Sequence, residues 1–321
     1  MNTPILEVNQ LQVSFKKEKE EITVVNGISF VVHAGETLGI VGESGCGKSI
    51  TSLSIMRLIS SPGRITSGQI VYNNRDLTQL SEEEMRIVRG NEISMIFQEP
   101  MTSLNPVFTI GRQIDEIILL HTCASKQEAK EQSIEMLKRV GISRAEQIYR
   151  SYPFELSGGM RQRVMIAIGM ACQPKLLIAD EPTTALDVTI QLQILDLMKK
   201  LQEKENTAII LITHDLGVVA EMCDRVLVMY AGEVVEEAVV DDLFHNPKHP
   251  YTIGLLQSMP SSVEKKSRLY TIKGQVPPAG SITKGCRFAE RCDHVIDRCW
   301  GEEPAIVLVG NNHTCRCWLH A

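Results

Sequence analysis

The chain has 321 residues, of which 43% are hydrophobic and 22% are charged, and its formal net charge at pH 7 is -6. This composition is that of an ordinary globular protein, and the length predicts one large domain with a smaller appendage. A negative net charge without a stripe rich in Lys and Arg argues against a duplex-binding protein, so we expect no nucleic-acid partner.

The apolar runs of the chain are short. The longest, Ala208 to Thr213 and Val226 to Tyr230, fall far below the roughly 20 residues that cross a bilayer. Residues Met1 to Glu7 carry neither the basic region nor the apolar core of a secretory signal. We therefore expect a cytosolic protein, with any membrane work done by partner chains.

The first part of the chain predicts strands around one helix. Residues Glu7 to Phe15 alternate apolar and polar side chains, which is typical of a strand with one buried face. The apolar run Thr37 to Val41 leads through a glycine-rich segment into a helical pattern from Lys48 to Ile59, and this order is that of a P-loop unit. Residues Gly68 to Tyr72 predict another strand.

The middle of the chain is mostly helical between about residues 100 and 173. Arg112 to His121 and Lys126 to Val140 are the clearest predicted helices. Strands then alternate with helices, and this alternation predicts a mainly parallel sheet covered on both faces. The predicted strands are Leu176 to Ala179, Ala208 to Thr213 and Val226 to Tyr230.

The residue composition changes after about Val240, where prolines and glycines interrupt a segment that ends in a group of cysteines. We therefore predict a first domain of residues 1–240, with a helical subdomain at about 100–173, and a C-terminal extension of residues 241–321.

The segment GESGCGKS fits the P-loop pattern and lies between a predicted strand and a predicted helix. Its glycines let backbone N–H groups turn toward phosphates, while Lys48 can reach the β and γ oxygens and Ser49 can ligate Mg²⁺. The positive end of the following helix adds to the attraction. A glycine turn without a ligand is the alternative. The predicted ATP-binding residues of this loop are Gly42, Glu43, Ser44, Gly45, Cys46, Gly47, Lys48, Ser49 and Ile50.

Two carboxylates end the predicted strand that begins at Leu176. Because side chains alternate along a strand, Asp180 can face Mg²⁺ while Glu181 points at an attacking water. His214 follows the next predicted strand, at the carboxyl edge where α/β proteins bind ligands. Taken alone, such a pair often caps a helix and a single histidine is more often structural.

A second glycine turn, Leu156 to Gln162, opens a helix that runs through Ile168. The N-terminus of this helix could bind a second anion, although the glycine loop already provides the phosphate site that one ATP needs in a monomer. This turn therefore points to a dimer.

These motifs, in this order, resemble the ATPase subunits of ABC transporters over the first three quarters of the chain. The resemblance implies an α/β fold of the P-loop NTPase class, with a RecA-like mainly parallel sheet core, an antiparallel β subdomain and a helical subdomain. It also implies a head-to-tail dimer, in which ATP lies between the P-loop of one subunit and Ser157, Gly158 and Gly159 of the other.

The resemblance also implies a role for single residues. Two of them depart from the family, since Phe15 replaces a common tyrosine and Cys46 stands where serine is frequent. The implied roles are adenine stacking for Phe15, γ-phosphate sensing, Mg²⁺ ligation and contact with the membrane partner for Gln98, Mg²⁺ ligation for Ser49 and Asp180, general base for Glu181, communication across the dimer for Asp187, and holding the γ-phosphate for His214.

The C-terminal extension has a narrower resemblance. Leu243 to Leu256, Gly274 to Pro277 and Gly285 to Cys292 are similar to the extension of oligopeptide, dipeptide and nickel importer ATPases. This resemblance implies import of peptides, or of nickel, at the cytoplasmic face of the plasma membrane. The implied partners are two permease subunits, a second ATPase subunit and, indirectly, an extracellular solute-binding protein.

Five of the nine cysteines crowd into Cys286 to Cys317. In a reducing cytosol such a cluster is more typical of a metal site than of disulfides. The resemblance implies a [4Fe–4S] cluster on Cys286, Cys292, Cys299 and Cys317, with Cys315 as an alternative fourth ligand. The spacing leaves zinc and unligated thiols open, because it matches neither zinc ribbons nor ferredoxins.

Two other functions share part of this pattern. A non-transport ABC ATPase would have the same ATP motifs, but such proteins usually carry a long coiled-coil insert or a second cassette, and neither is present in the sequence. A metal- or redox-responsive binding module that retains nucleotide binding is the third possibility. The intact pairing of Glu181 with His214 argues against it.

Overall fold

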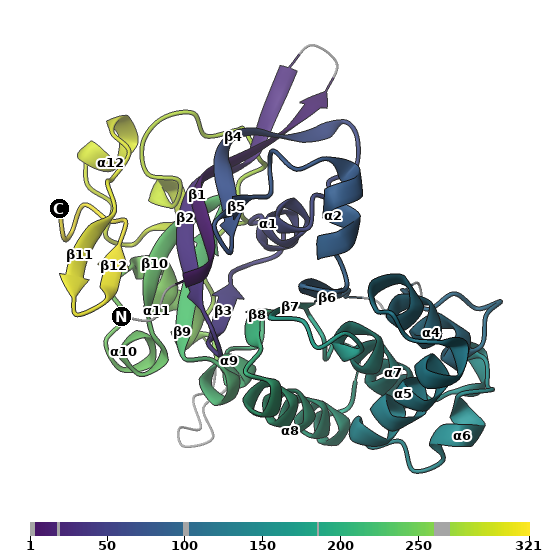
Figure 1. Ribbon diagram of the computed structural model, residues 1–321. Helices are drawn as coiled ribbons and strands as arrows, with labels where there is room; N and C mark the ends of the chain where they lie inside the picture. The colour runs from purple at the N-terminus through teal and green to yellow at the C-terminus, as the bar shows by residue number, and fades with distance from the viewer. Residues whose placement is uncertain (1–3, 18–19, 99–102, 185, 260–269) are drawn as a thin grey trace. The chain divides into compact units, whose positions relative to one another are not determined.

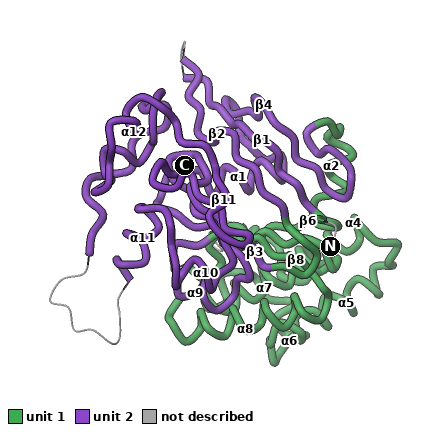
Figure 2. Tube along the Cα trace, turned by 90° about the vertical axis from the view of Figure 1, so that its left-hand side faces the viewer, with its two compact units in different colours: residues 1–5, 32–36, 79–212 green, residues 6–31, 37–78, 213–321 purple. Residues whose placement is uncertain are grey.

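The computed structural model describes residues 4–17, 20–98, 103–184, 186–259 and 270–321. The chain forms two compact units, which Figure 2 shows in two colours. Residues 1–5, 32–36 and 79–212 form the helical unit, and residues 6–31, 37–78 and 213–321 form the P-loop unit. The predicted boundary at Val240 stays a prediction, as does the helical subdomain, whose first residues lie outside the described ones.

An antiparallel sheet in the order β2-β1-β4-β5 belongs to the P-loop unit. Its strands are β1 (Pro4–Lys17), β2 (Glu20–His33), β4 (Gly63–Tyr72) and β5 (Arg75–Asp76). A bulge after Asn9 shifts the register of β1 against β4, so the buried side chains pass from Leu6 and Val8 to Leu11 and Val13. Strand β1 is longer at both ends than the predicted strand Glu7 to Phe15.

The second sheet of the P-loop unit is built on β3 (Thr37–Val41), which pairs in parallel with β9 (Arg225–Tyr230). Three antiparallel strands follow in the order β10 (Glu233–Val239), β12 (His313–Cys315) and β11 (Val307–Gly310). Part of the C-terminal extension thus belongs to the same sheet as the strand before the glycine loop.

The helices of the P-loop unit are short. The predicted helix from Lys48 ends at Ile55 rather than Ile59, because Arg57 has a left-handed backbone with φ 51°. The helical segments are α1 (Lys48–Ile55), α9 (Leu216–Met222), α10 (Val240–His245), α11 (Pro250–Gln257), the 3₁₀ turn η2 (Ala289–Arg291) and α12 (Arg298–Gly301).

The helical unit contains three parallel strands, β6 (Ile93–Ile96), β7 (Leu176–Asp180) and β8 (Ala208–Ile212). All residues of β7 and β8 are buried, as expected for parallel strands covered on both faces. The helical segments are α2 (Glu82–Val88), α4 (Ile110–His121), α5 (Lys126–Arg139), α6 (Ala145–Ile148), η1 (Pro153–Glu155), α7 (Gly158–Met170) and α8 (Val188–Glu205).

Helix α7 links the two layers of the helical unit, since it packs on β6 and α8 and also on α4 and α5 (Figure 1). The two clearest predicted helices are confirmed as α4 and α5 within two residues at each end. Within the described ranges, no helix combines the length and the apolarity that crossing a membrane requires.

Candidate functional site

The glycine loop joins β3 to α1, and its backbone requires glycine. Gly42, Gly45 and Gly47 have φ values of 151°, 81° and 106°, a region that side chains disfavour. A Cβ atom at Gly42 would lie 2.2 Å from the Met229 carbonyl oxygen. The loop can therefore follow this path only with a glycine at its first position.

Lys48 lies inside the loop. It is 7% exposed, and its Nζ donates hydrogen bonds to the carbonyl oxygens of Gly42 at 2.7 Å and Glu43 at 3.2 Å. The Cys46 thiol lies 3.9 Å from the same Nζ, and burial raises its pKa, so the thiol is neutral at physiological pH. The neutral thiol thus does not cancel the positive charge of Lys48, and Ser49 and Ile50 follow Lys48 in the first turn of α1.

Glu43 is held by two residues of the C-terminal extension, which the sequence analysis missed. Arg291 pairs with both carboxylate oxygens, at 2.6 Å and 3.0 Å. The Tyr251 hydroxyl oxygen accepts a hydrogen bond of 2.8 Å from the Glu43 backbone N–H. Both residues lie in segments that resemble the importer extension, but that resemblance implied no role for either of them at the glycine loop.

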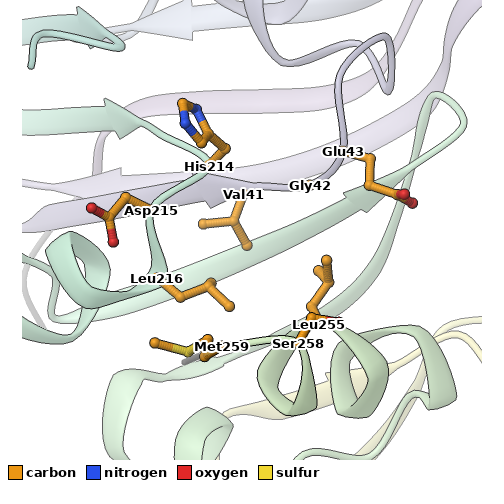
Figure 3. Close-up of a pocket in the computed structure, with 9 residues that line it drawn as sticks. All are labelled: Val41, Gly42, Glu43, His214, Asp215, Leu216, Leu255, Ser258 and Met259. Atoms are coloured by element: carbon orange, nitrogen blue, oxygen red, sulfur yellow. The ribbon is translucent and has the colours of Figure 1, made fainter. Parts of the chain in front are cut away.

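His214 and the glycine loop line the same cavity, which has a volume of about 320 Å³. Figure 3 shows its walls, with Gly42 and Glu43 on one side and His214 and Asp215 on another. Asp215 accepts hydrogen bonds from the N–H groups of Gly217 at 2.8 Å and Val218 at 3.4 Å, and so caps α9. The cap fixes the backbone directly after His214.

In the helical unit, the two predicted carboxylates lie at the end of β7. Asp180 is the last residue of the strand and is buried. The Glu181 carboxylate accepts hydrogen bonds of 2.9 Å from the Gln98 side-chain amide and from the Thr184 hydroxyl. Glu181 also has a φ of 48°, which is uncommon for a residue with a side chain and is often found at functional sites.

The hydrogen bonds to Glu181 have a chemical consequence. Two donors favour the ionised carboxylate and hold it in one orientation. A carboxylate that accepts a proton from water must be ionised and positioned beforehand. The two hydrogen bonds provide the second of these requirements, the position of the carboxylate. Thr184 was not predicted, because none of the motifs identified in the sequence includes it.

The second glycine turn lies next to the start of α8. Ser157 caps α7 by accepting a hydrogen bond of 3.4 Å from the Met160 N–H, and Asp187 caps α8 by accepting one of 3.0 Å from the Ile190 N–H. A Cβ atom at Gly159 would lie 2.9 Å from a methyl carbon of Ile190. Ser157, Gly158 and Asp187 are not buried, so this surface of the helical unit faces solvent.

The predicted site residues thus form three groups. The glycine loop and His214 lie together in the P-loop unit, where Phe15 is half-buried on β1 opposite Gly63. In the helical unit, Gln98 lies with Glu181, and the second glycine turn lies with Asp187.

Four cysteines of the extension, Cys286, Cys292, Cys299 and Cys317, line one small cavity. Cys315 is fully buried on β12 opposite Glu236. Burial raises the pKa of Cys286 to about 12 and also raises the pKa of Cys292 and of Cys317. All nine cysteines are free thiols. In the part of the chain that the structure describes, no three His, Cys, Asp or Glu side chains are placed to hold a metal ion.

Two family descriptions match the chain. The first, ABC transporter, covers residues 25–184 and so includes the glycine loop, the second glycine turn, Asp180 and Glu181. The second is the oligopeptide/dipeptide transporter C-terminal region, which covers residues 235–299. The contacts to Glu43 from Tyr251 and Arg291 come from this second region.

Curated relatives match over nearly the whole chain. The oligopeptide transport ATP-binding protein AppD of Bacillus subtilis is 57% identical over 317 residues, which cover 98% of this chain and 97% of the relative. The dipeptide transport ATP-binding protein DppD of Escherichia coli is 48% identical over 98% of this chain and 96% of its own length.

A solved structure has a similar fold. It is the dimeric structure of a post-hydrolysis state of the ATP-binding cassette MJ0796 bound to ADP and Pi, with a TM-score of 0.66 and 28% identity. The match covers 73% of this chain and 98% of that one.

Proposed function

The chain belongs to the ABC transporter family and is one of its ATPases, and we propose that it powers the import of oligopeptides or dipeptides through partner permeases. The cargo rests on the names of relatives that match nearly the whole chain and on the matched C-terminal region. Nickel is the alternative cargo, because the residues that choose the cargo lie in other chains.

We propose the following roles for the predicted site residues in ATP binding and hydrolysis. Lys48 and the N–H groups of the glycine loop bind the phosphates, and Phe15 stacks on the adenine. Asp180, Ser49 and Gln98 would hold Mg²⁺. When bound, Mg²⁺ neutralises charge on the phosphate oxygens. Glu181 takes a proton from the attacking water, which then bonds to the γ-phosphorus as the bond to ADP breaks. His214 holds the γ-phosphate.

We further propose that the functional form is a head-to-tail dimer, with itself or with a paralogue. Ser157, Gly158 and Gly159 of one subunit then complete the phosphate site of the other, and Asp187 lies at the same interface. The accessibility of this surface supports this arrangement, as does the dimeric state of the similar cassette MJ0796. Splitting the site between two subunits makes hydrolysis depend on closure, which couples it to transport.

The location and the remaining partners complete this proposal. The ATPase binds two permease subunits at the cytoplasmic face of the plasma membrane as a peripheral protein. An extracellular solute-binding protein delivers the cargo to the permeases and has only an indirect relation to this chain.

A finer proposal concerns the four cysteines that line one cavity, which would hold a [4Fe–4S] cluster, with zinc as the alternative. Their shared cavity supports it, although among the described residues no three His, Cys, Asp or Glu side chains are placed to hold a metal ion. Binding would require loss of the thiol protons, which burial retains. Anaerobically purified protein should be brown and contain about four iron atoms per chain. Colourless, iron-free protein would overturn this assignment.

The observation that carries the hydrolytic role is the Glu181 carboxylate held by Gln98 and Thr184. Glu181→Gln should lower phosphate release by about 10² to 10⁴-fold, while ATP still binds, because a general base contributes that much to a rate. Glu203→Gln, on the exposed face of α8, is the matched control and should hydrolyse ATP normally. Normal turnover by Glu181→Gln would remove Glu181 as the base.

A further inference from the structure

The segment from Cys286 to Cys292 has two faces with different contacts. Its two terminal cysteines line the cavity with Cys299 and Cys317. Between them lie two arginines, Arg287 and Arg291, which reach residues on and around the glycine loop. One short segment therefore connects the cysteine cavity with the nucleotide loop.

Arg291 makes the first connection. Its side chain is 4% exposed and forms a two-point ion pair with the Glu43 carboxylate. Such pairs fix direction as well as distance, because two parallel hydrogen bonds form. The Arg291 Nε donates a third hydrogen bond of 2.7 Å to the Lys273 carbonyl oxygen, so the guanidinium is fixed from its other side.

Tyr251 holds the backbone of the same residue. Its hydroxyl oxygen accepts the Glu43 N–H at 2.8 Å, and the tyrosine is fully buried. Phe288, from the middle of the cysteine segment, packs against Tyr251 with ring centroids 5.4 Å apart and against Tyr230 at 5.2 Å. Both the side chain and the backbone of Glu43 are thus held by the extension, and close packing leaves little freedom for either contact.

Arg287 makes the second connection, to the other end of the loop. Its Nε lies 2.7 Å from a Glu233 carboxylate oxygen, and its Nη1 donates a hydrogen bond of 2.5 Å to the Ala231 carbonyl oxygen. The residue between them, Gly232, donates its N–H to the Cys46 carbonyl oxygen at 2.9 Å. Arg287 therefore fixes the turn that holds the glycine loop at Cys46.

We propose that Arg291, Tyr251 and Arg287 are positioning residues of the nucleotide site, through which the C-terminal extension sets the affinity for ATP. This inference rests on the proposed role of the glycine loop as the ATP site. Bound phosphate needs several N–H groups and the Lys48 ammonium aimed at one point. A loop that is fixed beforehand loses less conformational entropy on binding, so its loosening weakens ATP binding. The chemical step depends on other residues.

The test measures ATP binding by the full-length chain carrying Arg291→Met, Glu43→Gln or both. Each single variant should weaken ATP binding about five- to twentyfold, since a hydrogen-bonded charge pair is lost. The double variant should have the same affinity for ATP as the single variant with the lower affinity, because each change removes the same contact. Turnover by Arg291→Met at saturating ATP should stay within about twofold of the unchanged protein.

Arg298→Met is the matched control. Arg298 lies in the same extension and pairs with Glu302 at 2.8 Å, but both side chains are at least half exposed. This variant should bind ATP as tightly as the unchanged protein. Equal effects of Arg298→Met and Arg291→Met would show that the extension acts only through general stability, and would overturn the proposal.

Two further variants separate the possible failures. If Arg291→Met does not fold, Tyr251→Phe removes only the oxygen that accepts the Glu43 N–H and should weaken ATP binding about two- to fivefold. If the folded variants bind ATP as tightly as the unchanged protein and Lys48→Ala binds it more weakly, the positioning role is overturned but the glycine loop remains the ATP site. Unchanged binding by Lys48→Ala as well would instead reject the glycine loop as the ATP site.

Discussion

The two glycine turns of this ATPase have opposite surroundings. The loop from Gly42 to Ser49 is held by hydrogen bonds with distant parts of the chain, at Gly232, Tyr251 and Arg291. The turn from Ser157 to Gly159 is capped locally by its own serine and is accessible to solvent. The first turn is held in place by residues of its own unit, and the second is an accessible surface.

This difference separates the two requirements of a shared active site. Binding ATP needs a preformed loop, and a loop held on several sides is preformed. Completing the site only on association needs a surface that stays accessible until the partner arrives. Changes at the first turn should therefore alter ATP affinity, and changes at the second should alter turnover.

The largest effect is expected for Ser157→Arg, which tests whether the second turn acts in turnover and not in ATP affinity. A bulky cation in the second turn should block closure, and we expect phosphate release to fall about 100-fold while the Kd for ATP stays within about twofold. Ser125→Arg is the control, because Ser125 caps α5 in the same unit with the same type of hydrogen bond. A loss of ATP affinity in Ser157→Arg would contradict the division of roles.

The next effect concerns Lys48→Ala, which should weaken ATP binding about 10- to 100-fold because a charged donor is lost from the loop. Lys284→Ala, an exposed lysine of the same unit, is the control.

If two copies form the dimer, a mixture of Lys48→Ala and Ser157→Arg should hydrolyse ATP faster than the sum of the separate variants. Each mixed dimer then has one intact composite site, so failure to recover would reject self-pairing.

Substitutions in the two turns should also differ in their effect on the free energy of unfolding. Gly42→Ala places a Cβ atom 2.2 Å from a carbonyl oxygen, at a φ of 151°. It should lower the free energy of unfolding by about 2 kcal/mol. The nearest atom to a Cβ atom at Gly158 is a Leu186 methyl carbon at 3.9 Å, so Gly158→Ala should cost less than about 0.5 kcal/mol. Denaturant titrations of both variants measure the difference, and equal losses would contradict it.

The smallest effect is expected for Cys46→Ser. Position 46 contributes mainly its backbone, and the neutral thiol lies 3.9 Å from Lys48, so the Kd for ATP should change by less than about threefold. A tenfold change in an ATP titration would show that the thiol itself contributes to binding.

The sequence predicted those parts of the site that depend on local pattern. The glycine loop, the buried strand before it and the carboxylates after β7 could be found because their residue types and spacing are specific. Ser157 and Asp187 also have the residue types that cap helices, and this second role was overlooked. The helix from Lys48 was predicted too long because the left-handed conformation of Arg57 has no sequence signal.

The contacts between Glu43 and the extension could not be predicted from the sequence. Arginine, tyrosine and glutamate are common residues, and nothing in their neighbourhood specifies a partner. Glu43 and Arg291 are 248 positions apart, so their contact follows from the fold of the whole P-loop unit. The same is true of the four cysteines, whose shared cavity depends on how the extension packs.

This separation also sets an order of events during synthesis. A ribosome adds about 5 to 20 residues per second, so Arg291 leaves it about 10 to 50 seconds after Glu43. During that interval the nascent chain carries the glycine loop without Tyr251, Arg287 or Arg291 beside it. The loop therefore acquires its final surroundings, and with them its full affinity for ATP, only near the end of translation.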